Sequence, residues 1–132
     1  LSLIGDRITD IHVIYVATMM YSNKSIRRLN LGMNEITSVG AEELAKMIEN
    51  NTALVQLRLH NNKIGDQGGI DFLSSLPKSK SLLFLDLKGN NITTETHDRI
   101  SDAIHLKRDQ LHHDIETVFQ DTINSDRTCI WN

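Results

Sequence analysis

The chain has 132 residues, 39% hydrophobic and 23% charged, so it can form one domain with a hydrophobic core but has little room for a second. Its 14 Lys and Arg and 17 Asp and Glu residues give a net charge of −3 and are interspersed, which argues against a nucleic-acid partner. The longest apolar run, residues 11–21, is interrupted by His12 and Thr18 and is too short to span a bilayer, which argues against a membrane partner.

One pattern recurs along the chain with a period of 28 residues. Residues 1–25 hold a partial copy that is already inside its strand at Leu1 (LSLIGDRI). Complete copies begin at Ile26 (IRRLNLGMNEI), Leu54 (LVQLRLHNNKI) and Leu82 (LLFLDLKGNNI). We therefore expect repeats over residues 1–105, with one partial copy at 1–25 and three copies that start at residues 26, 54 and 82.

Each copy predicts a short strand followed by a helix. Leucines separated by one residue, such as Leu57 and Leu59, lie on one face of a strand, and strands one period apart predict a parallel sheet. Apolar pairs four residues apart, such as Leu44 and Ile48, predict a helix with one face against the strands. Residue types that cap helix N-termini share one column, which predicts that the helices begin at Asp10, Ser38, Asp66 and Thr94.

These columns resemble the leucine-rich repeat pattern L-x-x-L-x-L-x-x-N-x-I, and the 28-residue period with a helical second half is similar to the ribonuclease-inhibitor-like class. The resemblance implies an α/β solenoid with a curved parallel sheet on the concave side and helices on the convex side. It also implies a structural ladder of side chains that hydrogen-bond the turns, formed by Asp6, Asn34, Asn62 and Asn90. NOD-like receptors, Ran GTPase-activating proteins, ribonuclease inhibitor and tropomodulin share this family's recognition of proteins through the solenoid surface.

Beyond the third copy, the strand pattern is replaced by a helical one. A fourth strand would start at residue 110 and would need Gln110 and His113 at two of its apolar positions, so the array is expected to stop there. Apolar residues then recur at helical spacing, namely Leu111, Ile115, Val118 or Phe119, and Ile123. We predict a C-terminal capping helix over residues 106–124, with a break near residues 105–108 that lets residues 111–123 cover the end of the core.

Residues 125–132 are expected to form a tail, for which two interpretations stay open. If Asn132 is the native C-terminus, the last four residues, from Cys129 on, have the form of a prenylation signal, although Trp131 and Asn132 are atypical in it. Alternatively, Ile130 and Trp131 fold back on the last helix. Because the single cysteine cannot form an internal disulfide, the sequence favours an intracellular, cytoplasmic location.

Two surfaces are candidates for binding a protein partner. Side chains that alternate with the buried leucines point outward from the concave face, and we expect partner contacts there from Arg28, Arg58, His60, Phe84, Asp86 and Lys88. On the N-terminal helix, an apolar group replaces the charged outer face of the second copy, and it consists of Ile14, Tyr15, Thr18 and Tyr21. Such a face predicts docking on a missing N-terminal segment, on another subunit, or beneath the tail around Trp131.

No pattern in the sequence indicates a catalytic group, a metal site or a cofactor site. We therefore expect a non-catalytic module for protein-protein interaction or assembly, such as a scaffold, an adaptor or a subunit of a complex. Two alternatives remain, a structural subunit locked in a large complex and a regulator of a GTPase. Functional residues of such a regulator cannot be identified in this sequence.

Overall fold

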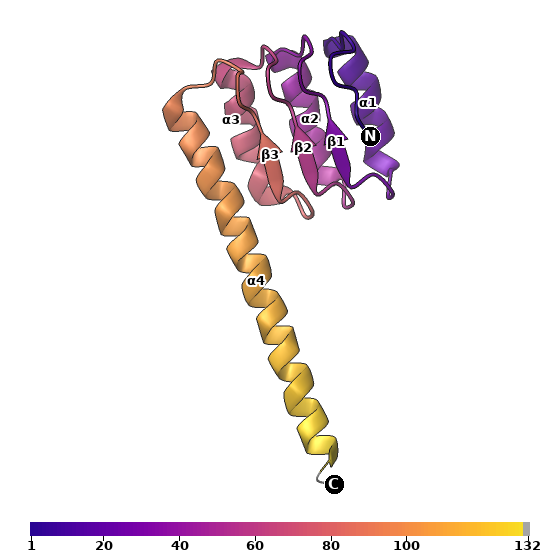
Figure 1. Ribbon diagram of the computed structural model, residues 1–132, viewed down its shortest axis with the longest axis vertical. Helices are drawn as coiled ribbons and strands as arrows, with labels where there is room; N and C mark the ends of the chain where they lie inside the picture. The colour runs from indigo at the N-terminus through magenta and orange to yellow at the C-terminus, as the bar shows by residue number, and fades with distance from the viewer. Residues whose placement is uncertain (131–132) are drawn as a thin grey trace.

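The computed structural model describes residues 1–130, and it describes side chains for residues 1–125. Three parallel strands, β1 (Arg28–Asn30), β2 (Gln56–Arg58) and β3 (Phe84–Asp86), form one layer. Helices α1 (Asp10–Ser22), α2 (Ser38–Asn50) and α3 (Gly65–Ser75) form the layer behind it (Figure 1). A short 3-10 helix, η1 (Leu76–Lys78), follows α3, and α4 (Thr94–Ile130) ends the described chain. The predicted α/β repeat fold is confirmed.

The 28-residue period sets the register of the sheet. Leu29 pairs with Leu57, and Leu57 pairs with Leu85, in parallel strands. The partial first copy joins the same sheet, because Ser2 forms a parallel bridge with Asn30. The buried strand leucines and the inner helix residues of the copies belong to one continuous core. Each copy therefore buries its apolar residues against its neighbours, as stacked repeats require.

Every copy leaves its strand through a residue in the left-handed region of backbone conformation. Gly5, Met33, Asn61 and Gly89 stand one period apart and have φ values of 68°, 57°, 54° and 72°. A side chain is disfavoured in this conformation, and glycine is the residue that adopts it without strain. Because glycine occupies only two of the four positions, the column is not apparent from the sequence.

The four residues predicted to cap their helices instead lie within the first turn of each helix. The N-cap of α2 is Thr37, whose hydroxyl accepts a hydrogen bond from the Val39 N–H at 3.3 Å. Asp10 acts on the next copy, because its Oδ1 accepts from the N–H groups of Thr37 at 2.8 Å and Gly40 at 3.0 Å. The predicted starting points of the helices are confirmed to within one residue, but the predicted caps are wrong. The carboxylate of Asp10 joins two successive copies.

The third copy's helix, α4, begins at the predicted Thr94, but it continues without the predicted break near residues 105–108. Its first turns cap the repeats, with Ile100 and Ile104 buried in the core. Farther along, α4 extends away from the repeats (Figure 1), and its apolar residues there are exposed, namely Leu111, Ile115, Val118 and Phe119. The prediction that residues 111–123 cover the core is therefore wrong, because the unbroken helix carries these residues past the sheet.

Two basic side chains of α4, Lys107 and Arg108, make hydrogen bonds at the sheet edge where a fourth strand would pair. The carbonyl of Val55 accepts a hydrogen bond from the N–H of Leu83 in the next copy at 2.9 Å. One period later the carbonyl of Leu83 accepts instead from Arg108 Nε at 2.8 Å. Lys107 Nζ donates to the carbonyl of Ser79, and burial lowers the pKa of its ammonium group. Because these carbonyls are paired by α4 itself, the array can stop without a break in the helix.

The predicted end of the helix at residue 124 is wrong, because α4 continues through residues 125–130. Both interpretations of the tail concern side chains outside the described residues. The side chains of residues 126–130 are not described, and neither are residues 131–132. Prenylation at Cys129 and packing of Trp131 against the last helix therefore stay predictions.

Candidate protein-binding surfaces

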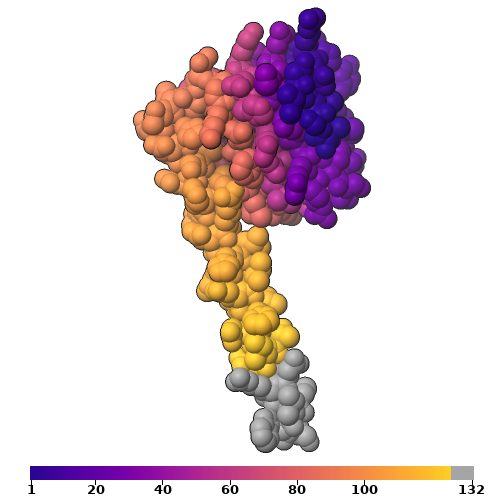
Figure 2. Space-filling view, viewed as in Figure 1, coloured from indigo at the N-terminus to yellow at the C-terminus, as the bar shows by residue number. Residues whose placement is uncertain are grey.

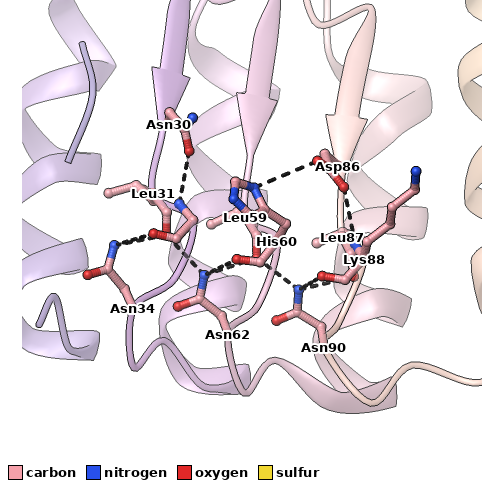
Figure 3. Close-up of polar contacts among 11 residues, drawn as sticks. Asn30, Leu31, Asn34, Leu59, His60, Asn62, Asp86, Leu87, Lys88 and Asn90 are labelled. Carbon is pink, nitrogen blue, oxygen red and sulfur yellow. Dashed lines mark hydrogen bonds and ion pairs between the residues drawn. The ribbon is translucent and has the colours of Figure 1, made fainter. Parts of the chain in front are cut away.

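The asparagine ladder holds the sheet and its turns in place. Asn62 Nδ2 donates to the carbonyl of Leu59 in its own turn and to that of Leu31 in the preceding copy, both at 2.9 Å (Figure 3). Asn62 Oδ1 accepts from the N–H of Ile36, also in the preceding copy, at 3.0 Å. Asn34 and Asn90 make the equivalent bonds in their own copies. A buried amide with all these partners has a structural role.

The first ladder position behaves differently. Asp6 is exposed, and among the described residues its side chain makes no ladder hydrogen bond. In the later copies, half of the hydrogen bonds of each ladder amide are made to the preceding copy. The described residues contain no copy before the one that holds Asp6. The predicted ladder therefore has three members in this chain.

The concave surface, defined by Arg28, Gln56, Arg58, His60, Phe84, Asp86 and Lys88, is built around one aromatic ring. Phe84 lies between two guanidinium groups, with the Cζ of Arg58 at 5.6 Å and that of Arg108 at 5.9 Å from its ring centroid. With its amide oxygen turned toward Arg58, Gln56 accepts two hydrogen bonds from that guanidinium at 2.6 and 3.0 Å. Contacts from β2, β3 and α4 thus hold Arg58 and Phe84 in a defined arrangement.

His60 and Asp86 are less available for binding than the sequence predicts. Both are half-buried, and His60 Nδ1 lies 3.7 Å from Asp86 Oδ2 with no hydrogen-bond partner (Figure 3). The His60 ring rests on Gly32, where an added Cβ would lie 2.2 Å from its Cε1. Asp86 Oδ1 accepts from the N–H of Lys88 at 3.2 Å. The larger exposed groups of the concave surface are Arg28, Arg58, Phe84 and Lys88.

The concave surface is positively charged although the whole chain is acidic. Arg28, Arg58 and Lys88 are exposed on it, and Asp86 is its one carboxylate. A hollow of about 310 Å³ beside Arg28 and Arg58 reaches the N-terminal Leu1. A partner surface that carries carboxylates fits this charge.

The four residues singled out on α1 are all exposed, namely Ile14, Tyr15, Thr18 and Tyr21. The Thr18 hydroxyl donates to the Ile14 carbonyl at 2.8 Å, so it is satisfied within the helix. Sequence reasoning missed two exposed neighbours, Ile11 and Met19. Met19 stands in the column of the buried Met47, so its pattern indicated a core residue. No described residue covers this face, and Trp131 lies outside the described part of the chain.

Sequence reasoning also missed the exposed stripe on α4, which we define as Leu111, Ile115, Val118 and Phe119 and call the α4 stripe. A hollow of about 410 Å³ along it is lined by Asp114, Ile115, Val118, Phe119 and Thr122. At about 100° per residue, Asp114 and Asp121 flank one side of the stripe and Glu116 the other. Residues 109–125 contain four carboxylates and no Lys or Arg. The stripe is therefore an apolar surface with acidic borders.

Among the described residues, no group of three or more His, Cys, Asp or Glu side chains could hold a metal ion. No described helix is long and apolar enough to cross a membrane. The expected absence of a cofactor and of a nucleic-acid partner stays a prediction.

The repeats match a known family of sequences. The profile of the family described as "Leucine Rich repeat" matches residues 22–45, 50–73 and 78–95, which together make up half of the chain. The chain belongs to the leucine-rich repeat family. Placement of these leucine-rich repeats in the ribonuclease-inhibitor-like class stays a prediction based on the period. A comparison with curated proteins finds no match in sequence.

Two solved leucine-rich repeat structures are similar to this one. "Leiomodin-1 Actin-Binding Site 2 (ABS2)" has a TM-score of 0.79 and 23% identity, with 91% of this chain and 69% of that chain covered. The tropomodulin C-terminal domain of Caenorhabditis elegans has a TM-score of 0.70 and 21% identity, with 85% and 69% covered. The 93 residues before α4 make up about 70% of the 132-residue chain. Both matches cover a larger share than this, so both include part of α4. The likeness shows a shared fold that extends into the terminal helix.

Proposed function

We propose that this chain is a non-catalytic protein-interaction module that binds actin. The α4 stripe carries the proposal, because it is an apolar surface on a helix that projects from the repeats with nothing in the described chain to cover it. A contiguous exposed apolar patch of this kind is typical of a protein-binding site. Actin is proposed as the partner because the similar leiomodin-1 domain, whose match includes part of this helix, is named as an actin-binding site.

The chemistry of the α4 stripe indicates what its partner must offer. Phe119 is an exposed aromatic residue, and aromatic residues are frequent in binding hot spots. Asp114 and Glu116 border the stripe on opposite sides, so the partner surface needs an apolar centre with Lys or Arg residues around it. The same carboxylates disfavour pairing of α4 with another α4, because acidic borders would meet.

The concave surface supplies a second contact of opposite charge. Arg58 and Phe84 are held against each other by β2, β3 and α4, so little conformational entropy is lost when a partner packs on them. The partner region that meets this surface should be acidic, whereas the region that meets the α4 stripe should be basic. Two contacts of opposite charge define the orientation of the partner along the chain.

The proposal is tested by measuring binding of the chain to monomeric actin by fluorescence and to filamentous actin by co-sedimentation. Val118→Glu places a charge in the α4 stripe and should raise the Kd at least about tenfold, because a buried carboxylate without a partner costs more than about 1.4 kcal/mol. Gln120→Glu is the matched control, since it adds the same charge about 140° around the helix from Ile115. Binding of neither actin form, or equal Kd values for the two variants, contradicts the proposal.

The contribution of the concave surface is tested separately. Arg58→Glu and Phe84→Ala should weaken actin binding without lowering the thermal stability of the repeats, because both side chains lie at the surface. Lys24→Glu on the loop after α1 is a control for the change of charge outside the concave surface. If both concave variants bind actin as tightly as the unmodified chain, this surface is not used.

A further inference from the structure

The sheet ends at β3, which is its outermost strand on the side of α4 (Figure 1). In the copy before it, Leu59 N–H donates to the Asp86 carbonyl of β3 at 2.8 Å. Leu87 stands one period after Leu59, and its N–H has no equivalent acceptor among residues 1–130. The outer edge of β3 is therefore open at a position where the earlier copies are joined by hydrogen bonds.

Leu85, in the middle of β3, directs its backbone toward this outer edge. Phe84 N–H donates to the Val55 carbonyl at 3.1 Å and the Asp86 carbonyl also pairs with the preceding copy, so both neighbours of Leu85 face β2. Successive residues of a strand direct their backbone groups to opposite edges, so the N–H and carbonyl of Leu85 point away from β2. No described strand lies there to pair with them. The Leu85 side chain is only half-buried, whereas Leu57 in β2 is fully buried.

A hollow of about 230 Å³ lies along this outer edge, between β3 and α4. Residues 84–88 form one wall, and a face of α4 that includes Ser101, Ile104 and Arg108 forms the other. Arg108 Nε pairs with the Leu83 carbonyl, so it closes the edge at the start of β3 and leaves the rest open. We call this hollow, together with the outer edge of β3, the edge groove. It lies at the end of the repeats from which α4 emerges, opposite the first copy (Figure 2).

The edge groove has the geometry of a site for an extended peptide. Such a peptide adds a strand to a sheet edge, where main-chain hydrogen bonds supply affinity and pockets for alternate side chains supply specificity. Here Leu85 and Leu87 offer the main-chain groups, and the hollow offers space for side chains. A helix could not use these groups, because its own N–H and carbonyl groups are paired internally.

The lining of the edge groove indicates which side chains the peptide carries. Ile100 and Ile104 line its core side, where an apolar side chain fits. Lys88 and Arg108 are exposed cations in the lining, which contains one carboxylate, the half-buried Asp86. This excess of positive charge favours an acidic segment. Because side chains alternate between the two faces of a strand, the segment that fits has acidic and apolar residues in alternation.

We propose that the edge groove binds an extended acidic segment of a partner protein, which adds to β3 as a fourth strand. The backbone of the segment pairs with the N–H and carbonyl of Leu85 and with the N–H of Leu87. Its apolar side chains enter the hollow beside Ile104, and its carboxylates lie next to Lys88 and Arg108. The inference does not rest on actin binding, because it concerns main-chain pairing at the sheet edge and not the α4 stripe.

A second copy of this chain fits the edge groove less well than an acidic segment. Pairing of two β3 edges about a two-fold axis would place the strands antiparallel, with the start of each next to the end of the other. Lys88 of each copy would then lie near Arg108 of the other. These like charges would repel each other, whereas an acidic segment pairs with both.

Titration of the isotope-labelled chain with a short synthetic peptide, in which Glu alternates with Val, tests the inference. The amide signals of Leu85 and Leu87 should shift with a Kd between about 10 µM and about 1 mM, and hydrogen exchange at both amides should slow at least about tenfold. A peptide in which Lys alternates with Val should bind at least about tenfold more weakly. Equal binding of the Glu and Lys peptides excludes an acidic partner segment.

Two further peptides test whether the main chain pairs. Methylation of alternate backbone nitrogens in the Glu peptide removes the donors along one of its edges and keeps every side chain. The peptide methylated on the edge that faces β3 should lose binding. The peptide methylated on the opposite edge should bind as the unmodified peptide does.

A substitution in the chain tests the place of binding. Ser101→Phe fills the hollow from α4 and should raise the Kd of the Glu peptide at least about tenfold, because the side chains of the peptide then lack space. Leu106→Phe is the matched control, since it also introduces an exposed aromatic ring on α4, about 140° around the helix from Ser101. It should leave the Kd unchanged. Circular dichroism checks that both variants keep the repeat fold.

Three more results would overturn the inference. The first is the absence of any shift at Leu85 and Leu87 up to about 5 mM Glu peptide. The second is equal binding of the two half-methylated peptides, because the main chain then plays no part. The third is a dimer in sedimentation equilibrium that Ser101→Phe dissociates and Leu106→Phe does not, because this makes a second copy the occupant of the edge groove.

Discussion

Replacing Asn62 with alanine measures what the ladder contributes to stability. The buried Asn62 side chain makes its three shortest hydrogen bonds to the carbonyls of Leu31 and Leu59 and the N–H of Ile36. A longer one, at 3.4 Å, reaches the carbonyl of His60.

Alanine leaves the N–H of Ile36 without a partner inside the protein. The two carbonyls each lose one of two donors, because Leu31 still accepts from Asn34 Nδ2 at 3.0 Å and Leu59 from Asn90 Nδ2 at 2.8 Å. An unpaired buried N–H costs about 1–3 kcal/mol and each lost carbonyl hydrogen bond about 0.5–1.5 kcal/mol, and water that enters the vacated space reduces the sum. The free energy of unfolding should therefore fall by about 2–4 kcal/mol.

A second substitution, Asn62→Asp, keeps the shape of the side chain and adds a dependence on pH. The introduced carboxylate still accepts from the N–H of Ile36, but it places negative charge against the carbonyls of Leu31 and Leu59. The pKa of this carboxyl in the folded state should therefore lie above its unfolded value of about 4. With the folded pKa raised, the variant is most stable relative to the unmodified chain below about pH 4 and loses stability as the pH rises through the folded pKa.

Urea unfolding followed by circular dichroism, from about pH 3 to about pH 8, measures both effects against the unmodified chain. Asn124→Asp, at an exposed position on α4, makes the same chemical change outside the ladder and should alter stability by less than about 0.5 kcal/mol. The reasoning is refuted if Asn62→Ala lies within about 1 kcal/mol of the unmodified chain, or if the deficit of Asn62→Asp does not change with pH.

Gly89→Ala should lower stability by about 1–2 kcal/mol in urea unfolding, because φ is +72° there and the new Cβ would lie 2.1 Å from a side-chain amide oxygen; an unchanged midpoint contradicts this. Hydrogen bonds from Thr93 hold the pKa of Asp66 below its usual value of 3.8. Asp66→Ala should therefore be less stable than the unmodified chain above about pH 4, and this difference in stability should vanish as the pH falls through the lowered pKa. A constant difference in an acid titration would exclude this. Arg108→Ala removes the hydrogen bond to the Leu83 carbonyl and should accelerate amide hydrogen exchange in α4 near residue 108, whereas unchanged exchange would show that Arg108 does not fasten the helix.

The features that recur in every copy could be predicted from the sequence. Leu29, Leu57 and Leu85 pair in the sheet because each occupies the same place in its copy, and a spacing of 28 residues shows this directly. Asn62 forms the expected hydrogen bonds for the same reason. Such residues can be found without the three-dimensional structure, because stacking of the repeats places residues one period apart next to each other.

The ends of the array could not be predicted, because their interactions occur once. Arg108 reaches the Leu83 carbonyl from the part of α4 that extends beyond the length of α1, α2 and α3, so no column reveals it. Met19 stands one period before the buried Met47, yet it is exposed on α1. The spacing of Ile115 and Val118 predicts a helix correctly, but periodicity does not tell which surface covers an apolar face. Both candidate docking surfaces beyond the sheet arise from these ends.

The straight helix α4 also acts as a spacer of set length. It rises about 1.5 Å per residue, so Ile123 lies roughly 22 Å along the axis from Arg108, the residue fastened to the sheet. One added residue turns the outer half of the helix by about 100° while it lengthens the arm by only about 1.5 Å, so it changes mainly the direction. An insertion of seven residues would lengthen the arm by about 10 Å and nearly restore the original rotation. Distance and angular direction at the far end can therefore change independently during evolution, while the repeats stay the same.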